Sequence, residues 1–192
     1  VTFSGFDYIP TNNVSTGILA YSLGSGTLAI TGNTFTNTEA PVYDNTSTLD
    51  IASIAAANTF NQPFVILNDD GIYSTIQGAL VDAVAGDAIH VYGTHVVDSQ
   101  ITVDKAITLH GETGAKIQVS GTGYRFLFTA GGTLTGLEIE KTDKTGTQNI
   151  IGIQSNDVTI SDNVIHGQYV MGDGEVARAM EVSGGYNNIS IT

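Results

Sequence analysis

A short pattern of apolar and polar positions recurs along the chain. It consists of an apolar residue, two small or turn-forming residues, an asparagine or a substitute, any residue, and a second apolar residue. Six copies begin at Phe3, Ile30, Ala55, Leu109, Leu134 and Ile160, and the same phase returns at Ile191. Apart from the gap between Ala55 and Leu109, the step between successive copies is 25 to 31 residues. It falls within the range of about 20–50 residues that is typical of solenoids and other repeat folds, in which each repeat forms one coil or unit.

The segments between the copies have the composition of short strands. They are rich in β-branched residues, alternate between apolar and polar positions, and end at Gly, Asn or Asp, for example at 89–92, 101–103, 117–119 and 158–160. Alternation of this kind indicates strands with one buried face. Together with the repeat, it predicts an all-β fold, specifically a right-handed parallel β-helix.

Stacking of the coils would place equivalent residues about 4.8 Å apart, the spacing of neighbouring strands. We therefore expect apolar side chains to stack in the interior and asparagines to form a ladder at a tight turn, a position that asparagine tolerates well. The predicted ladder comprises Asn33, Asn58, Asn163, Phe35, Phe60 and Ile165. The alternative is a β-sandwich with unrelated turn asparagines, which has no reason to repeat at a constant step.

A helical period replaces the coil pattern between the third and fourth copies. Apolar residues spaced by three and four positions run from Ile76 to Val84, and Gly86 ends the run. It is the one helix that the sequence predicts, over residues 74–86. A helix laid across the open end of a solenoid covers unpaired strand edges, so we expect a cap formed by Ile76, Leu80, Ala83 and Val84. Residues 1–67 would then be the last coils of one β-helix. Residues 68–192 would be the cap and first coils of a second.

Residues 73–112 carry a family resemblance. They contain the helical run, a Gly86-Asp87 turn, an apolar strand, a Gly93-Thr94 turn and the strand Ile107-Thr108-Leu109-His110-Gly111. This order resembles the start of a pectin-lyase-like right-handed parallel β-helix. The layout is also similar to the tandem β-helix repeats of large bacterial surface and adhesin-type proteins. The resemblance implies the fold, whereas the superfamily includes lyases, hydrolases, tailspikes and non-catalytic adhesins.

The charge balance narrows the range of partners. The chain has 19 Asp plus Glu, 6 Lys plus Arg and no cysteine. A surface this acidic repels nucleic acid and anionic lipid, and no apolar run is long enough to span a membrane. We therefore expect no nucleic-acid partner and no membrane span. Glycans, or other copies of the chain through end-to-end homo-assembly, are the expected partners of a secreted or cell-surface protein.

Candidate chemistry is sparse. If the chain is an enzyme, the resemblance points to an arginine base near carboxylates, and the candidates are Arg178, Asp162 and His166. No cofactor is expected, although surface carboxylates could bind calcium. The calcium candidates are Asp69, Asp70, Asp157, Asp162 and Asp173.

Threonine is plentiful, and flat threonine ladders occur on ice-binding solenoids. No Thr-x-Thr motif repeats at the coil spacing, so the sequence does not predict such a ladder. The leading interpretation is a structural, non-catalytic, adhesive segment that could form fibres by end-to-end stacking. The alternative is a β-helix that binds or degrades polysaccharides as a lyase or hydrolase.

Overall fold

The structure, a computed structural model, describes residues 1–4, 16–21, 27–68, 70–144, 148–168 and 177–192. These residues are mostly β, and their parallel strands form the coils of a β-solenoid, about 6 in all. The predicted fold class is therefore confirmed. The chain divides into two compact units, one comprising 1–82 with 89–91 and the other 83–88 with 92–192. Whether they are two separate solenoids, as the sequence predicts, stays a prediction. No helix in the described residues has the length and apolar character needed to cross a membrane.

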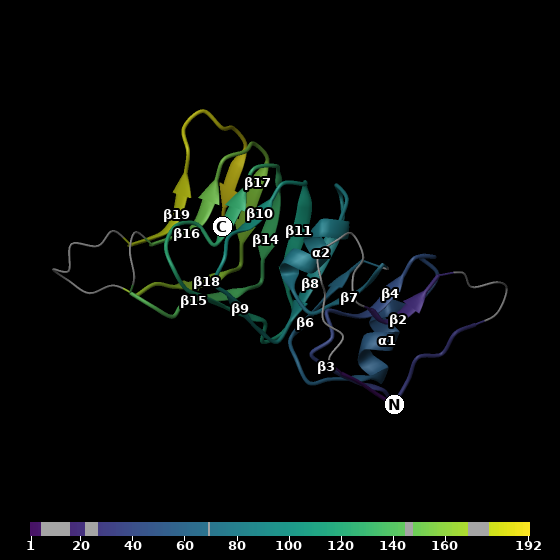
Figure 1. The fold of residues 1–192 in the computed structure, drawn as a ribbon. Helices are drawn as coiled ribbons and strands as arrows, with labels where there is room; N and C mark the ends of the chain where they lie inside the picture. The colour runs from purple at the N-terminus through teal and green to yellow at the C-terminus, as the bar shows by residue number, and fades with distance from the viewer. Residues whose placement is uncertain (5–15, 22–26, 69, 145–147, 169–176) are drawn as a thin grey trace. The chain divides into compact units, whose positions relative to one another are not determined.

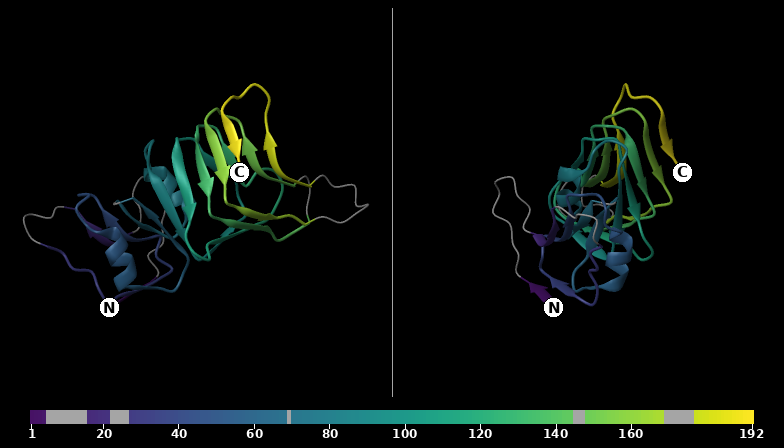
Figure 2. Two further views of the ribbon diagram at one scale, coloured as in Figure 1. Left: turned by 180° about the vertical axis from the view of Figure 1, so that it is seen from behind. Right: turned by 90° about the vertical axis from the view of Figure 1, so that its right-hand side faces the viewer.

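The second unit is built from coils of three strands. In chain order these strands are β9 (Thr94–Val97), β10 (Ile101–Val103), β11 (Ile107–Gly111), β12 (Lys116–Val119), β13 (Phe126–Phe128), β14 (Gly132–Thr135), β15 (Glu138–Lys141), β16 (Gln148–Ile153), β17 (Val158–Ser161), β18 (Val164–His166), β19 (Ala177–Val182) and β20 (Ile189–Ile191). Every third strand pairs in parallel, so four coils of the described chain contribute to three sheets, β9-β12-β15-β18, β10-β13-β16-β19 and β11-β14-β17-β20. Figures 1 and 2 show these strands side by side, from teal to yellow.

The core of this unit is a set of side-chain columns that run from coil to coil. Because side chains alternate across a strand, each strand turns every second residue inward. Val103, Phe128 and Ile153 are in register and are fully buried. A second column contains Leu109, Leu134 and Ile160, which are 0 to 3% exposed.

The first unit has fewer parallel strands. Its elements are β1 (Thr2–Ser4), β2 (Thr16–Ala20), β3 (Thr34–Thr36), β4 (Ala40–Asp44), α1 (Ile51–Ala57), β5 (Thr59–Phe60), β6 (Phe64–Leu67), β7 (Gly71–Tyr73) and α2 (Ile76–Asp82), and β8 (Ala88–Tyr92) contributes residues 89–91. The pairs β1–β3, β3–β5 and β2–β4 are parallel. Strand β7 is antiparallel to both β4 and β6. Strands β6 and β7 follow one another in the chain and pair through Leu67 and Gly71.

Asparagine side chains tie successive coils together in both units. In the first unit, Asn58 Oδ1 accepts from the backbone N–H of Asn33 at 2.8 Å, and Asn58 Nδ2 donates to Ile30 O at 2.8 Å. In the second unit, Asn163 Oδ1 accepts from Leu137 N at 3.0 Å, and its Nδ2 donates to Leu134 O at 2.8 Å. Each amide thus bridges the turn of the coil that precedes it.

The apolar positions beside these asparagines also stack. Phe35 and Phe60 are in register, and their rings lie nearly parallel with centroids 5.2 Å apart. Phe35 is fully buried, whereas Phe60 is half-buried. In the second unit Ile165 pairs with the buried Ile139 and is itself half-buried, since β18 belongs to the last described coil.

The described chain contains two helices, one more than the sequence analysis predicts. Helix α1 begins after Asp50, whose carboxylate accepts from Ser53 N at 3.0 Å and caps the first turn. It buries Ile51 and Ile54. The copy of the repeat that begins at Ala55 therefore starts in the last turn of a helix and not in a strand.

Helix α2 is shorter than the predicted helix 74–86. It buries Ile76, Ala79 and Leu80 and contacts β6 and β7 of the first unit. The buried Tyr73 donates from its hydroxyl to Asp82 at 2.9 Å, at the last residue of the helix. Ala83 is buried, but Val84 is 63% exposed because the helix has already ended and its period no longer sets the direction of that side chain. The role of α2 as a cap of the second solenoid stays a prediction.

Candidate functional site

The residues predicted for catalysis lie on separate segments of the second unit. Arg178 is on β19, His166 is on β18 of a different sheet, and Asp162 lies in the turn between β17 and β18 with a left-handed φ of 55°. Within the described residues no hydrogen bond or ion pair joins any two of them. Each has a local environment of its own, and these environments define the candidate sites.

His166 belongs to a charged ladder on the outer face of the β9-β12-β15-β18 sheet. Lys116 Nζ lies 3.1 Å from Glu138 Oε1 and 2.9 Å from Glu140 Oε2. His166 Nε2 lies 3.8 Å from Glu138 Oε1. The hydrogen bond from Lys116 lowers the pKa of the Glu140 carboxyl, and the same bond raises the pKa of Lys116. Lys116 thus bridges the two carboxylates, and its single positive charge balances one of their two negative charges.

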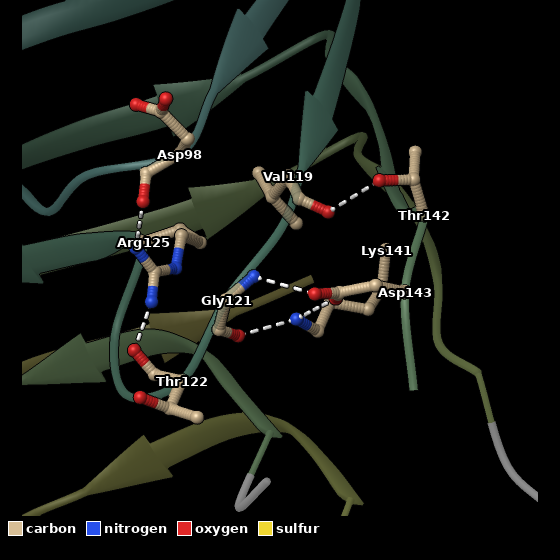
Figure 3. A network of polar contacts seen from close by, with 8 residues as sticks. All are labelled: Asp98, Val119, Gly121, Thr122, Arg125, Lys141, Thr142 and Asp143. Carbon is tan, nitrogen blue, oxygen red and sulfur yellow. Dashed lines mark hydrogen bonds and ion pairs between the residues drawn. The ribbon is translucent and has the colours of Figure 1, made fainter. Parts of the chain in front are cut away.

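Two buried cations hold the corner between β12 and β13 (Figure 3). Arg125 donates from Nη1 to Asp98 O at 2.8 Å and from Nη2 to Thr122 O. Lys141 donates to Gly121 O and forms an ion pair with Asp143, which in turn accepts from Gly121 N at 2.8 Å. Buried charges of this kind require hydrogen-bonded partners, and here those partners are mostly backbone carbonyls. The arrangement fixes the path of residues 120–125.

This corner places Tyr124 beside Arg178. The ring of Tyr124 lies over Gly152, where a Cβ would come within 2.6 Å of the ring. Burial raises the pKa of the Tyr124 hydroxyl, and its hydrogen bond to Glu181 adds to the effect. Glu181 Oε2 also accepts from Asn149 Nδ2 at 3.1 Å and lies 3.4 Å from Arg178 Nη1. An aromatic ring, an amide, a carboxylate and a guanidinium thus gather on the β10-β13-β16-β19 sheet.

The calcium candidates are dispersed. Asp69 and Asp173 lie outside the described residues. Asp70 Oδ1 accepts from Ser47 Oγ at 3.2 Å in the first unit, and Asp157 Oδ1 accepts from Asn188 Nδ2 at 2.6 Å in the second. Within the described part of the chain, Asp70, Asp157 and Asp162 belong to no group of three or more candidate metal ligands.

Comparisons with known proteins do not extend this picture: no family model, curated protein or solved structure matches the chain. The fold by itself defines the class of protein, which is a β-solenoid.

Proposed function

We propose that the chain is a structural, non-catalytic, adhesive segment of a secreted or cell-surface protein, and that its solenoid is extended by end-on stacking of a second copy. The pectin-lyase-like β-helix that the sequence resembles, and the tandem arrangement of surface adhesins, are part of this proposal. The observation that carries it is the way the core columns end in the last described coil.

The last coil exposes apolar side chains at interior positions. Val182 continues the column of Val103, Phe128 and Ile153, which are fully buried, yet Val182 is 45% exposed. Ile191 continues the column of Leu109, Leu134 and Ile160 and is 56% exposed. These side chains occupy interior positions of the last described coil. A second copy stacked on this coil would bury them, and burial of apolar area contributes about 25 cal/mol per Å².

The backbone of the last described coil also offers strand edges to a partner. Strands β18, β19 and β20 are the terminal strands of their three sheets within the described residues. The edge of a parallel sheet presents unpaired N–H and C=O groups that can pair with another chain. Core columns and sheet edges therefore terminate in the same coil, which is the geometry that end-on stacking requires.

Sedimentation velocity over a range of protein concentrations tests the proposal. We expect the 192-residue chain to self-associate, and a Val182→Lys/Ile191→Lys variant to remain monomeric because lysine cannot enter an apolar column. The control is Val96→Lys, which replaces an equally apolar side chain that is 74% exposed on β9 but lies on the side of a coil. A monomeric wild-type chain, or equal loss of association in the control, would contradict end-on stacking.

Glycan binding or degradation is the second candidate, and the group around Tyr124 favours it. An aromatic ring flanked by Asn149, Arg178 and Glu181 offers an apolar surface and polar groups for sugar hydroxyls. Incubation with a panel of polysaccharides tests this candidate. Binding that is lost in Tyr124→Ala, or release of unsaturated or reducing ends that is lost in Arg178→Ala, would favour it over the structural role.

A further inference from the structure

Hydroxyl side chains form two columns on the β11-β14-β17-β20 sheet. Thr108, Thr133, Thr159 and Ser190 are in register on the four strands. Two positions further along, His110, Thr135 and Ser161 are in register, and Thr192 follows Ile191 in the same phase, donating from its backbone N–H to Ile160 O at 3.0 Å. Seven of the eight positions therefore carry a hydroxyl.

Both columns face outward. The residue between them on each strand is apolar, and Leu109, Leu134 and Ile160 are buried in the core. Alternation along the strands puts the flanking side chains on the opposite face, where they are partly or fully exposed. Ser161 Oγ donates to Thr135 Oγ1 at 3.1 Å, so neighbouring hydroxyls are also linked along the column. The packed core beneath holds the array in place.

The sequence does not reveal this array as a repeat. Thr133-Leu134-Thr135 is a complete Thr-x-Thr motif, but the equivalent positions read Thr-x-His, Thr-x-Ser and Ser-x-Thr. The steps between the strands are also unequal, since β11, β14, β17 and β20 begin at Ile107, Gly132, Val158 and Ile189. The columns therefore become visible only in the paired strands, which stay in register because the loops accommodate the differences in length.

The hydroxyl face also differs in charge from its neighbour. None of its eight positions is Lys, Arg, Asp or Glu, whereas the outer face of the β9-β12-β15-β18 sheet carries Lys116, Glu138 and Glu140. His110 is the one position of the eight without a hydroxyl, and its Nε2 lies 3.7 Å from Glu112 Oε1. In a chain with 19 acidic residues, an uncharged face of this regularity is distinctive. Its ligand must be one that matches a lattice of hydroxyls.

We propose that this hydroxyl face binds ice. From strand to strand its hydroxyls repeat at about 4.8 Å, and along each strand they repeat at about 6.6 Å, twice the rise per residue. Water oxygens on the faces of an ice crystal repeat on similar length scales in two directions. Because the core holds the strands that carry these side chains, the backbone of the face needs little ordering when it binds, which lowers the entropic cost of association.

Growth of single ice crystals in solutions of the 192-residue chain tests the proposal. We expect the wild-type chain to shape the crystals and to slow their growth. Thr133→Tyr and Thr159→Tyr should lose most of this effect, because a bulky ring at the centre of the array keeps the ice surface away from the neighbouring hydroxyls. Gln118→Tyr is the control, since it places the same ring on the charged face of the β9-β12-β15-β18 sheet.

Several outcomes would overturn the proposal. They are absence of ice shaping by the wild-type chain, full activity in both tyrosine variants, and equal loss in the Gln118→Tyr control. Binding to cellulose or chitin particles without any effect on ice would instead assign the face to a crystalline polysaccharide. Circular dichroism establishes that each variant is folded, and Thr133→Lys or Thr159→Lys, a solvated side chain at the same position, replaces a tyrosine variant that is not. Self-association in the Val182→Lys/Ile191→Lys variant is a separate readout, so the two proposals fail independently.

Discussion

Asn58 and Asn163 make the same pair of hydrogen bonds although they lie in different units. Each amide accepts from the N–H of the residue at its own position in the preceding copy and donates to the C=O three residues before that. Three of the four backbone groups that these asparagines bind, at Ile30, Asn33 and Leu137, lie outside the strands, and the fourth, Leu134 O, belongs to β14. The asparagine positions of the repeat therefore mark side chains that hydrogen-bond to the backbone of the preceding coil.

Removal of the Asn163 amide tests how much these two hydrogen bonds stabilise the fold. Asn163→Ala leaves Leu137 N and Leu134 O without these bonds, and each unsatisfied group costs about 1–3 kcal/mol where it is shielded from water. We expect the free energy of unfolding, measured with urea, to fall by a few kcal/mol. Ser155→Ala, which removes an exposed hydroxyl that donates only to Asn156 O, is the control and should change little. Equal stability of the two variants would contradict the bridging role.

Close contact between coils predicts a strong effect at Gly111. A Cβ at this position would lie 2.3 Å from Gly136 O of the next coil, too close for any side chain. Gly111→Ala should therefore force the coils apart and lower the unfolding free energy by about 1–3 kcal/mol or more, as overpacking does. Gly167→Ala is the matched control, because that position has open space and an ordinary φ. Thermal unfolding of both variants compares their melting temperatures, and only Gly111→Ala should melt well below the wild-type chain. An unchanged melting temperature for Gly111→Ala would show that the coils adjust freely.

The stacked pair Phe35 and Phe60 predicts unequal losses. Phe35 is fully buried and Phe60 is half-buried. Phe35→Ala should cost about 3–5 kcal/mol, the usual range for a buried aromatic residue, and Phe60→Ala should cost clearly less. Urea denaturation of both variants compares the two losses of unfolding free energy. Equal losses, or a larger loss for Phe60→Ala, would contradict the described burial of the two rings.

Asp44 should make stability depend on pH. Its side chain is 2% exposed. Burial raises the pKa of this carboxyl, but hydrogen bonds from Thr46 and from the backbone of Leu49, Thr46 and Thr48 outweigh it and lower the pKa below 3.8. A pKa that is lower in the folded state stabilises the fold above the unfolded value, and this contribution is lost as the pH falls through the folded value.

The measurement is the urea midpoint of the wild-type chain and of Asp44→Asn between about pH 6 and pH 3, a range that brackets the ordinary carboxyl pKa. Asparagine cannot accept from Thr48 N and Leu49 N while its other side-chain atom also accepts from Thr46, so the variant should be less stable near pH 6. The difference between the two proteins should shrink as the pH falls below about 4. A difference that stays constant with pH would show that the Asp44 carboxylate does not contribute in this way.

The sequence predicts features that depend on local chemistry and misses those that depend on register. The spacing of Asn33 and Asn58 reveals the coils because a turn needs a particular residue at one position. The hydroxyl columns are hidden in the sequence because Ser161 and Ser190 replace threonine without loss of the hydroxyl, and only the paired strands show which positions meet.

Helix α1 is missed for a different reason. Its signals are present, since Asp50 is a good cap and Ile51 and Ile54 have helical spacing. They overlap a copy of the repeat, which favours a strand at the same residues. The group around Tyr124 carries no motif, because Gly152 and Glu181 reach it from other coils.

The core columns also determine how the second unit opens. Each coil is stabilised only by its neighbours, so stability in a solenoid is close to a sum of nearest-neighbour terms. The coil formed by β18, β19 and β20 has one such neighbour in the described chain, whereas the coil formed by β12, β13 and β14 and the coil formed by β15, β16 and β17 each have two. Amide protons should therefore exchange first on these three strands and progressively later toward β12 and β13. A stacked partner would remove that gradient by giving the last coil its second neighbour.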